Sequence, residues 1–520
     1  MKSRTRYAQY DFTGGLNQDD HPLGLQPSEL RVANNVYWSG KALSSRRGTD
    51  NINTAAINGG TAVTGIFDYT RSAGASRDIV AVVGDKFYKD ARSATPTDIS
   101  GAVTITSGAA NACQFATFNE NLIVANGTNT PWRWTGTGNA AVLGGSPPAF
   151  KTIISKWNRV FGAGHTAAPR TIRFSALADE TTWAAADTVR ATLPDSGSAN
   201  AEGSDAIVTL GHLGDSIFCG LINSIGRVYY TGDSLAPFIY TQISSFGVAG
   251  PRAYVPFGDG GYFVSNRGVH YITTSDVSVS YQSSMVSGRK LRTYWAELGK
   301  TRVQNVSGTL YFTSNGNWIV VWSFTQGAGT QNNSILVMDV TDGPGNERFA
   351  IWTGIQANVL ATILNPTTYA EELLFGTNDG FIWQADTGSD DNGAAYLAEA
   401  TTRWEDFGQP GLRKRFRDLY LEFRQTGTFV INVDFQFDYE NAQTFTSAST
   451  ASNLWNWDDG TTWDSSTWGG LNVIQTRLLG VGDGHVLGFR YYTTGTGQLW
   501  SLYKSVVAVK VAGESVETLS

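Results

Sequence analysis

Residues 308–324 read GTLYFTSNGNWIVVWSF, two runs of strand-forming residues on either side of an Asn-Gly pair. Asn-Gly between such runs is a strong signal for a tight antiparallel hairpin, because both residues tolerate the positive φ angles that the turn requires. The stretch therefore predicts a short β-hairpin that ends in aromatic residues.

The same pattern recurs along the chain. Related stretches lie at 78–89, 121–134, 215–232, 260–273 and 371–386, with a weaker one at 157–175. Their spacing of roughly 40 to 60 residues is slightly longer than that of four-stranded propeller blades. One such sheet cannot cover both of its faces, so it has to stack against neighbours. We expect an all-β protein with a β-propeller of about seven blades, between six and eight; a plain β-sandwich stays open because the spacing is irregular.

Composition supports the all-β assignment. The chain has 520 residues, of which 41% are hydrophobic and 58 are glycines, enough for more than one packed domain with many tight turns. The net charge of -7 argues against a protein that grips nucleic acid electrostatically. Two cysteines provide neither a disulfide framework nor a thiolate zinc site, and the absence of a long apolar run predicts no membrane span.

The pattern changes after about residue 400. Phe429, Ile431, Val433, Phe435 and Phe437 alternate with polar residues, which is typical of a half-buried strand. We expect a C-terminal β-sandwich over 401–520, a propeller over 51–400, and a short N-terminal arm with a propeller-closing hairpin over 1–50.

Three stretches depart from the β pattern. Leu291, Tyr294, Trp295 and Leu298 share one face of a short predicted helix. Residues 185–206 and the tryptophan-rich 440–470 are predicted surface loops.

The termini carry a resemblance. Residues 14–48 contain GGLN, PSELRVANNVYW and SGKALSSRRG, in which we expect a helix, a strand and a hairpin. The repeated hairpins follow, and then KRFRDLYLEF and GTFVINV. This order of elements resembles the tail nozzle or tail-hub protein of short-tailed bacteriophages, also called tail tubular protein B or stabilization protein. The sharper matches are residues 14–48 and 412–433.

The resemblance implies a structural virion protein that is assembled in the host cytoplasm. It implies a homo-hexameric ring in the phage tail that seals the DNA channel and conducts the genome on ejection. Expected partners are tail adaptor (head-to-tail connector) proteins, a tail fibre or tailspike, and genomic DNA that passes without sequence-specific binding. The alternative is a glycan-binding or glycan-degrading propeller that contacts the host surface, and a cellular peptide-binding scaffold is a weaker one.

Two basic clusters and four tryptophans are the interface candidates. Basic side chains can dock on an acidic neighbour or a phosphate, although they can equally be solvated strand ends. Tryptophans in a polar loop either pack back or contact a partner or a glycan. The candidates are Arg46, Arg47, Arg413, Lys414, Arg415, Arg417, Trp455, Trp457, Trp463 and Trp468.

The sequence does not favour an enzyme. Its five histidines are scattered without metal-ligand spacing. DDGTTW at 458–463 looks like the Asp-box turn of sialidase-type propellers, which is structural and carries no chemistry by itself. We expect no enzymatic activity, no catalytic, cofactor-binding or metal-binding residues, and no cofactor.

Overall fold

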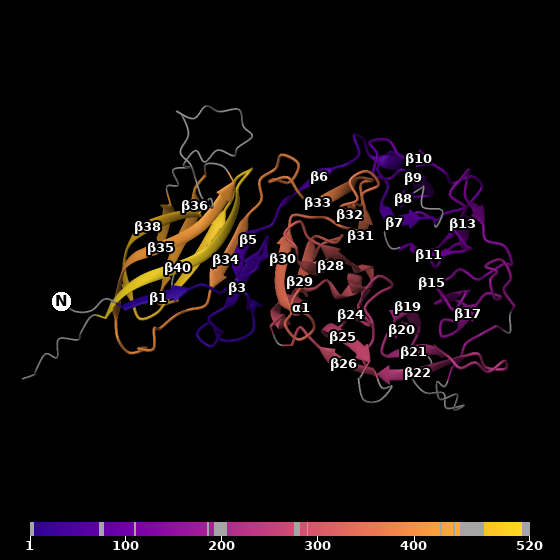
Figure 1. Ribbon diagram of the computed structural model, residues 1–520, viewed down its shortest axis with the longest axis horizontal. Helices are drawn as coiled ribbons and strands as arrows, with labels where there is room; N and C mark the ends of the chain where they lie inside the picture. Colours follow the sequence, from indigo (N-terminus) through magenta and orange to yellow (C-terminus); the bar gives the residue numbers. More distant parts are fainter. Residues whose placement is uncertain are drawn as a thin grey trace, which may run out of the picture.

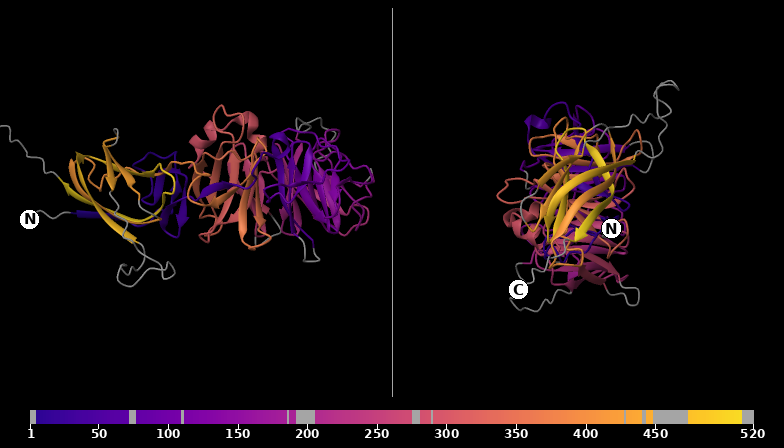
Figure 2. Two further views of the ribbon diagram at one scale, coloured as in Figure 1. Left: turned by 90° about the horizontal axis from the view of Figure 1, so that it is seen from above. Right: turned by 90° about the vertical axis from the view of Figure 1, so that its left-hand side faces the viewer.

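The computed structural model describes residues 5–71, 77–108, 111–184, 187–191, 205–274, 281–288, 290–426, 429–439, 443–447 and 473–511. These residues form two parts along the longest axis of the molecule, a ring of sheets and a two-layered β-structure beside it (Figures 1 and 2). The prediction of an all-β propeller with further sheets is confirmed.

The ring is formed by seven blades, of which six are separate sheets and one is part of a larger sheet. In chain order these blades contain β7 (Val63–Thr70), β8 (Arg77–Val83), β9 (Lys86–Lys89) and β10 (Thr97–Asp98) in blade 1; β11 (Gln114–Phe118), β12 (Asn121–Ala125), β13 (Trp132–Trp134) and β14 (Ala141–Val142) in blade 2; β15 (Thr152–Lys156), β16 (Arg159–Ala163) and β17 (Ile172–Phe174) in blade 3; β18 (Arg190–Ala191), β19 (Ile207–Leu213), β20 (Ser216–Leu221), β21 (Ile225–Tyr230) and β22 (Phe238–Ser244) in blade 4; β23 (Tyr254–Phe257), β24 (Gly260–Ser265), β25 (Gly268–Thr274) and β26 (Tyr281–Met285) in blade 5; β27 (Ser307–Phe312), β28 (Trp318–Phe324), β29 (Ser334–Asp339) and β30 (Arg348–Thr353) in blade 6; and β31 (Val359–Leu364), β32 (Glu371–Gly376) and β33 (Ile382–Thr387) in blade 7.

The ring is closed. Each blade's first long strand contacts the corresponding strand of the next blade, and β31 of blade 7 contacts β7 of blade 1. The fourth strand of blade 7 is β6 (Gly48–Asn51), which pairs antiparallel with β33. A strand from the N-terminal region therefore completes the last blade and removes a free edge.

Blade packing explains the continuous apolar runs in the sequence. In β8, Val80 and Val82 pack in the core between blades 1 and 2, whereas Ile79, Ala81 and Val83 pack in the core between blades 1 and 7. Successive side chains of a strand point to opposite faces, so a strand between two neighbours needs apolar residues at every position.

Two sheets form the second part. The first has the order β38-β35-β40-β5-β4, with β1 also paired to β40, and the second is the continuation of blade 6 through β3, β34, β39, β36 and β37. Their bounds are β1 (Thr5–Gln9), β2 (Gly15–Leu16), β3 (Glu29–Asn34), β4 (Val36–Ser39), β5 (Ala42–Ser45), β34 (Ala398–Thr402), β35 (Lys414–Thr426), β36 (Ile431–Phe437), β37 (Gln443–Ser447), β38 (Val473–Gly484), β39 (Leu487–Thr493) and β40 (Leu499–Val511).

The N-terminal region differs from the expected arm. β1 lies on β40, β3 lies between β30 of the propeller and β34, and the β4–β5 hairpin joins β40. Residues 29–34 are a strand where a helix was expected. The reason is that β3 and β4 each find a sheet edge to pair with, which satisfies their backbone groups without a helix.

The helix prediction is confirmed. α1 (Arg292–Glu297) buries Tyr294 and Trp295, and the flanking Leu291 and Leu298 are buried as well. Two 3-10 helices, η1 (Ile57–Gly59) and η3 (Lys300–Asn305), complete the helical elements of the described chain. Most of the predicted loops 185–206 and 440–470 lies outside the described residues; within them are β18 and β37.

Candidate functional site

The buried joint between the propeller and the sandwich contains Arg46, which was predicted to lie at an interface with another molecule. Its side chain is only 1% exposed. Its guanidinium donates to both carboxylate oxygens of Asp391, at 2.8 and 2.6 Å, and to the amide oxygen of Asn35 at 2.9 Å. It also lies 4.0 Å above the ring centroid of Tyr396. The interface prediction is wrong for Arg46, because its side chain is buried and its guanidinium is held by Asp391 and Asn35. Arg47 beside it is half-buried.

Asn35 holds three segments of this joint together. It adopts φ 53°, a left-handed conformation that Asn tolerates better than most residues. Its amide oxygen accepts from Thr353 N at 2.8 Å, and its amide nitrogen donates to Thr353 Oγ1 and Leu397 O. Asn34 and Asn35 thus lie in a packed junction between β3, β30 and β34.

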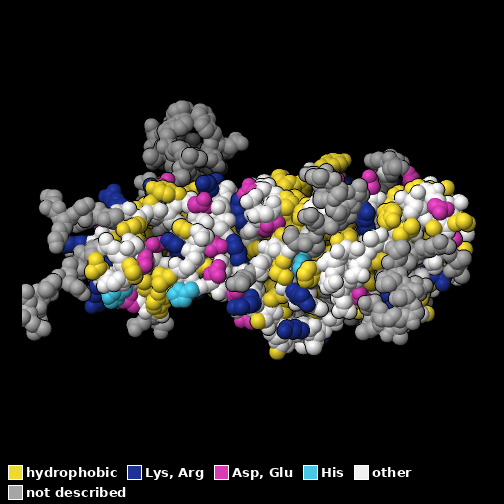
Figure 3. Space-filling view, turned by 90° about the horizontal axis from the view of Figure 1, so that it is seen from below, with side chains coloured by type: hydrophobic (Ala, Val, Ile, Leu, Met, Phe, Trp, Pro, Cys, Tyr) yellow, Lys and Arg dark blue, Asp and Glu magenta, His cyan; other side chains and the backbone are white. Residues whose placement is uncertain are grey.

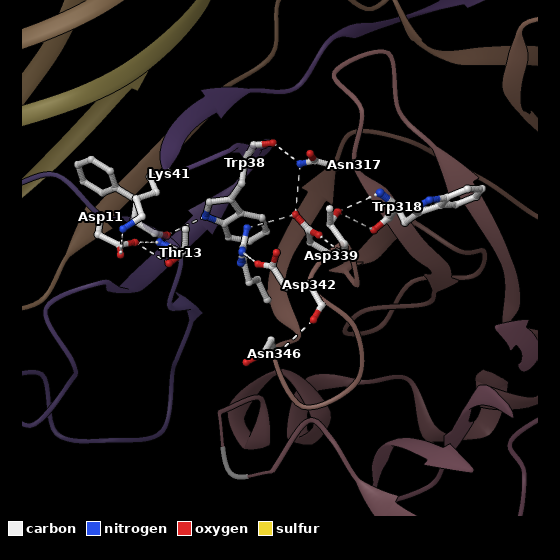
Figure 4. Close-up of polar contacts among 12 residues, drawn as sticks. Asp11, Thr13, Trp38, Lys41, Asn317, Trp318, Asp339, Asp342 and Asn346 are labelled. Carbon is white, nitrogen blue, oxygen red and sulfur yellow. Dashed lines mark hydrogen bonds and ion pairs between the residues drawn. The ribbon is translucent and has the colours of Figure 1, made fainter. Parts of the chain in front are cut away.

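Trp38 fixes the N-terminal hairpin against blade 6 (Figure 4). Its indole nitrogen donates to Phe12 O at 2.7 Å, and its carbonyl accepts from the amide of Asn317. Asn317 also reaches the buried carboxylate of Asp339, which forms an ion pair with Arg348. A single hydrophobic core continues from blades 4 to 7 into the sandwich, so the two parts are packed as one body.

Lys414 is the second predicted interface residue that the structure buries. Its side chain is 0% exposed, and its ammonium donates to Gln409 O, Leu412 O and His485 O at 2.5, 2.8 and 2.8 Å. Burial lowers its pKa from the ordinary value. Lys414, the first residue of β35, therefore holds the turn at 409–412 and the turn at His485 to this strand. The interface prediction is wrong for Lys414, because its ammonium is buried and fully engaged.

Arg413 and Arg415 do lie at the surface. Arg413 is 60% exposed and pairs with Asp483 at 2.8 Å, and Arg415 lies opposite Lys510 in the pairing of β35 with β40. Arg417 lies in β35, although its side chain is outside the described part of the structure. Trp455, Trp457, Trp463 and Trp468 all lie outside the described residues.

The two exposed arginines belong to a larger cationic face, which sequence analysis missed as a unit. It is the side of β1, β40, β35 and β38 that points away from the second sheet; the other side packs Phe416, Leu419, Leu421 and Phe423 into the core. Among the described side chains it carries Arg6, Arg413, Arg415, Arg424, Arg477, Lys504 and Lys510 against Asp418, Glu422 and Asp483. An excess of cations on one face of a chain with net charge -7 means that the rest of the molecule is more acidic still.

Aromatic rings order the cations at the centre of this face. The guanidinium carbons of Arg6 and Arg477 lie 5.7 and 5.6 Å from the ring centroid of Tyr420. The ammonium of Lys504 lies 5.0 Å from the ring of Tyr10, which is 55% exposed. These side chains line a groove of about 560 Å³ together with Glu422. Figure 3 shows several Lys and Arg side chains between hydrophobic ones over the sandwich.

The face suits an acidic partner. Cation–π contacts hold Arg6 and Lys504 in place without neutralising their charges, which can act on a group of opposite charge. Arg477 pairs with the buried carboxylate of Asp418 at 3.0 Å, and this hydrogen bond raises its already high pKa. In sequence, the only local signal is the alternation in RDLYLEF and KSVVAVK, which places Tyr420, Lys504 and Lys510 on the polar side of their strands.

The described residues hold no cluster of three or more His, Cys, Asp or Glu side chains suited to a metal ion. Over the same residues, no helix is long and apolar enough to cross a membrane.

No family model matches the chain, and no curated protein matches it by sequence. Solved structures with a distant likeness include Ycf48 bound to a D1 peptide, at 9% identity and TM-score 0.39, which covers 66% of this chain and 98% of that one. An ancestral GH74 enzyme has 11% identity and TM-score 0.38, covering 72% of this chain and 52% of that one. PorZ of the type-IX secretion system of Porphyromonas gingivalis has 12% identity and TM-score 0.35, covering 78% and 47%.

Proposed function

We propose that this protein is a structural subunit of a tail nozzle or tail-hub ring of a short-tailed phage. The observation that carries the proposal is the place of residues 14–48, the stretch with the sharpest resemblance. Through β3 they supply the strand between the propeller and the sandwich, and they lead directly into β6, which closes blade 7. A ring component under internal pressure needs this kind of rigid connection between its parts.

The cationic face supplies the contact between neighbouring subunits in this proposal. Opposite charges on facing surfaces orient partners and suppress wrong pairings. One copy presents Arg415, Lys510 and their neighbours, and the next copy presents part of its acidic remainder. In a closed ring each copy uses both surfaces once, as a heterologous interface requires.

The genome path in such a ring lies between subunits. The cavity on the propeller axis has a volume of about 370 Å³, which is the size of a small-molecule pocket and far too small for duplex DNA. We therefore place the channel on the symmetry axis of the ring. No enzymatic step is required for this role.

The test is the assembly state of the purified protein. We expect mass photometry and negative-stain microscopy to show a hexameric ring, alone or with the adaptor protein, and mass spectrometry to find the chain in purified virions. Arg415→Glu combined with Lys510→Glu should shift the ring to monomers, whereas Lys300→Glu, an exposed control on the propeller side, should not.

A monomer that neither forms rings with the adaptor nor occurs in virions would overturn the proposal. Binding of that monomer to host polysaccharide, measured by calorimetry, would instead support the glycan-binding alternative. If the variant with Arg415→Glu and Lys510→Glu still forms the ring, the proposed structural role stands, but the cationic face is not the contact between subunits.

A further inference from the structure

The propeller axis contains a charged residue that the proposed function does not use. Arg252 lies just before β23 and lines the axial cavity of about 370 Å³ together with residues of β7, β11, β15, β19, β27 and β31. It lies at the end of the ring where these strands begin, because its contacts are with residues that precede or start them.

Arg252 and Pro251 are held by most of the ring. The Arg252 guanidinium donates through Nη1 to Thr64 O at 2.8 Å and through Nη2 to Asn358 O at 3.1 Å. Gly308 N donates to the carbonyl of Arg252, and Gln114 and Thr209 donate to the carbonyl of Pro251 at 3.0 and 2.9 Å. Contacts with blades 1 and 7 thus hold the guanidinium, and contacts with blades 2, 4 and 6 hold the backbone of Pro251 and Arg252.

The positive charge of Arg252 has no counter-charge in the described structure. Its Nε is buried and donates to no described residue, and no ion pair with it is found among them. Asp68, the one carboxylate among the residues that line the cavity, is engaged by Arg77 at 3.2 Å and by Leu364 N at 2.8 Å. Backbone carbonyls satisfy hydrogen bonds but carry no net charge.

Neighbouring titratable groups do not supply a negative charge either. Burial raises the pKa of the Cys113 thiol to about 11, so this side chain is neutral at pH 7. Burial also lowers the pKa of Arg252 to about 10, which leaves the guanidinium charged at pH 7. Arg252 as a whole is half-buried, and its Nε is shielded from solvent. A charge that is partly removed from water without a counter-charge is costly unless an ion compensates it.

We propose that the axial cavity of the propeller binds a small oxyanion against Arg252. The planar guanidinium has N–H groups beyond those that hold the two carbonyls, and its fork matches the paired oxygens of a phosphate or a carboxylate. The cavity volume admits a free phosphate or a small organic acid and excludes a polymer. This site is independent of ring assembly, so it stands or falls separately from the proposed function.

Thermal unfolding tests the site with inorganic phosphate and with acetate, each against chloride at constant ionic strength. A ligand that binds only the folded state raises the unfolding midpoint. We expect phosphate, acetate or both to raise the midpoint of the wild-type protein and of Lys300→Met, an exposed control on the propeller, and to leave the midpoint of Arg252→Met unchanged. Comparison of the midpoint shifts in phosphate and in acetate distinguishes a phosphate site from a carboxylate site.

Two outcomes would overturn the proposal: no midpoint shift in the wild type with either anion, or an equal shift in Arg252→Met. If Arg252→Met does not fold, a crystal of the wild type soaked in selenate decides. An anomalous peak within hydrogen-bond distance of the Arg252 guanidinium supports the site, and a cavity without one overturns it.

Discussion

The blades and the joint between propeller and sandwich are built in opposite ways. A blade such as β7–β10 comes from about forty consecutive residues and buries mainly apolar side chains. The joint brings Asn35 and Arg46 to Asp391 and Tyr396, more than 300 positions away, and buries charged and amide groups.

The difference shows two routes to a fixed geometry. Apolar packing between blades is tolerant, because many residues of similar volume satisfy it. A buried polar network has few solutions, because each donor and acceptor needs a partner in the right place. The repeats are held mainly by apolar packing, whereas the joint adds a buried polar network to the hydrophobic core that the two parts share.

The largest expected effect is at the joint. Arg46→Met leaves Asp391 without its bidentate partner and removes one of the two donors to the Asn35 amide oxygen, so we expect a loss of about 3–5 kcal/mol in the free energy of unfolding. Urea unfolding followed by tryptophan fluorescence measures it. If the variant were as stable as the wild type, the joint would depend on apolar packing like the blades, and the contrast would disappear.

A smaller effect is expected from one polar group inside a blade. His270 of blade 5 is fully buried between Phe246 and Phe263, and its Nε2 lies 2.9 Å from Ser265 Oγ. Burial, with a contribution from Arg267, lowers its pKa to about 4. Its folded pKa is below the unfolded value near 6.5, so its contribution to stability is complete above pH 6.5 and declines as the pH falls toward 4.

The decline is at most about 1.4 kcal/mol per pH unit, because one proton is involved. The free energy of unfolding is measured from pH 7.5 to 4 for the wild type and for His270→Gln. The difference between the two profiles gives the contribution of His270. The variant should have a flatter profile over this range. Parallel profiles would mean that His270 becomes protonated in the folded protein, and that this blade tolerates a buried charge.

The smallest effect is expected at the surface pair of Arg413 and Asp483, whose side chains are 60% and 50% exposed. Solvent screens such a pair, so Arg413→Met should change the unfolding free energy by less than about 1 kcal/mol. The same urea titration serves here as the matched control for Arg46→Met. A loss as large as that at the joint would show that burial does not decide the strength of these pairs.

Local patterns in the sequence were sufficient for the blades. The hairpin at 308–324 appears as β27 and β28, although its second strand pairs on both sides. The helix with Tyr294 and Trp295 on its buried face also follows from spacing alone. These features involve residues close in the chain, where propensity and period decide the structure.

The joint and the axial arginine had no comparable local signal. Arg46 reads as part of a basic turn, and its partner Asp391 lies in a segment that resembles a calcium-type turn only in composition. Lys414 is different, because it shares the phase of Phe416 in β35 and the alternation already places it on the inner side. Arg252 follows a proline in an unremarkable stretch, and only the closure of the ring places it on the axis.

The strand exchange between the two ends of the chain also sets the order of events on the ribosome. β3, β5 and β6 leave the exit tunnel first, yet their partners β34, β40 and β33 are synthesised hundreds of residues later. During translation β4 and β5 can pair with each other, but β3 and β6 wait for β34 and β33, and blades 1 to 6 are synthesised before the ring can close.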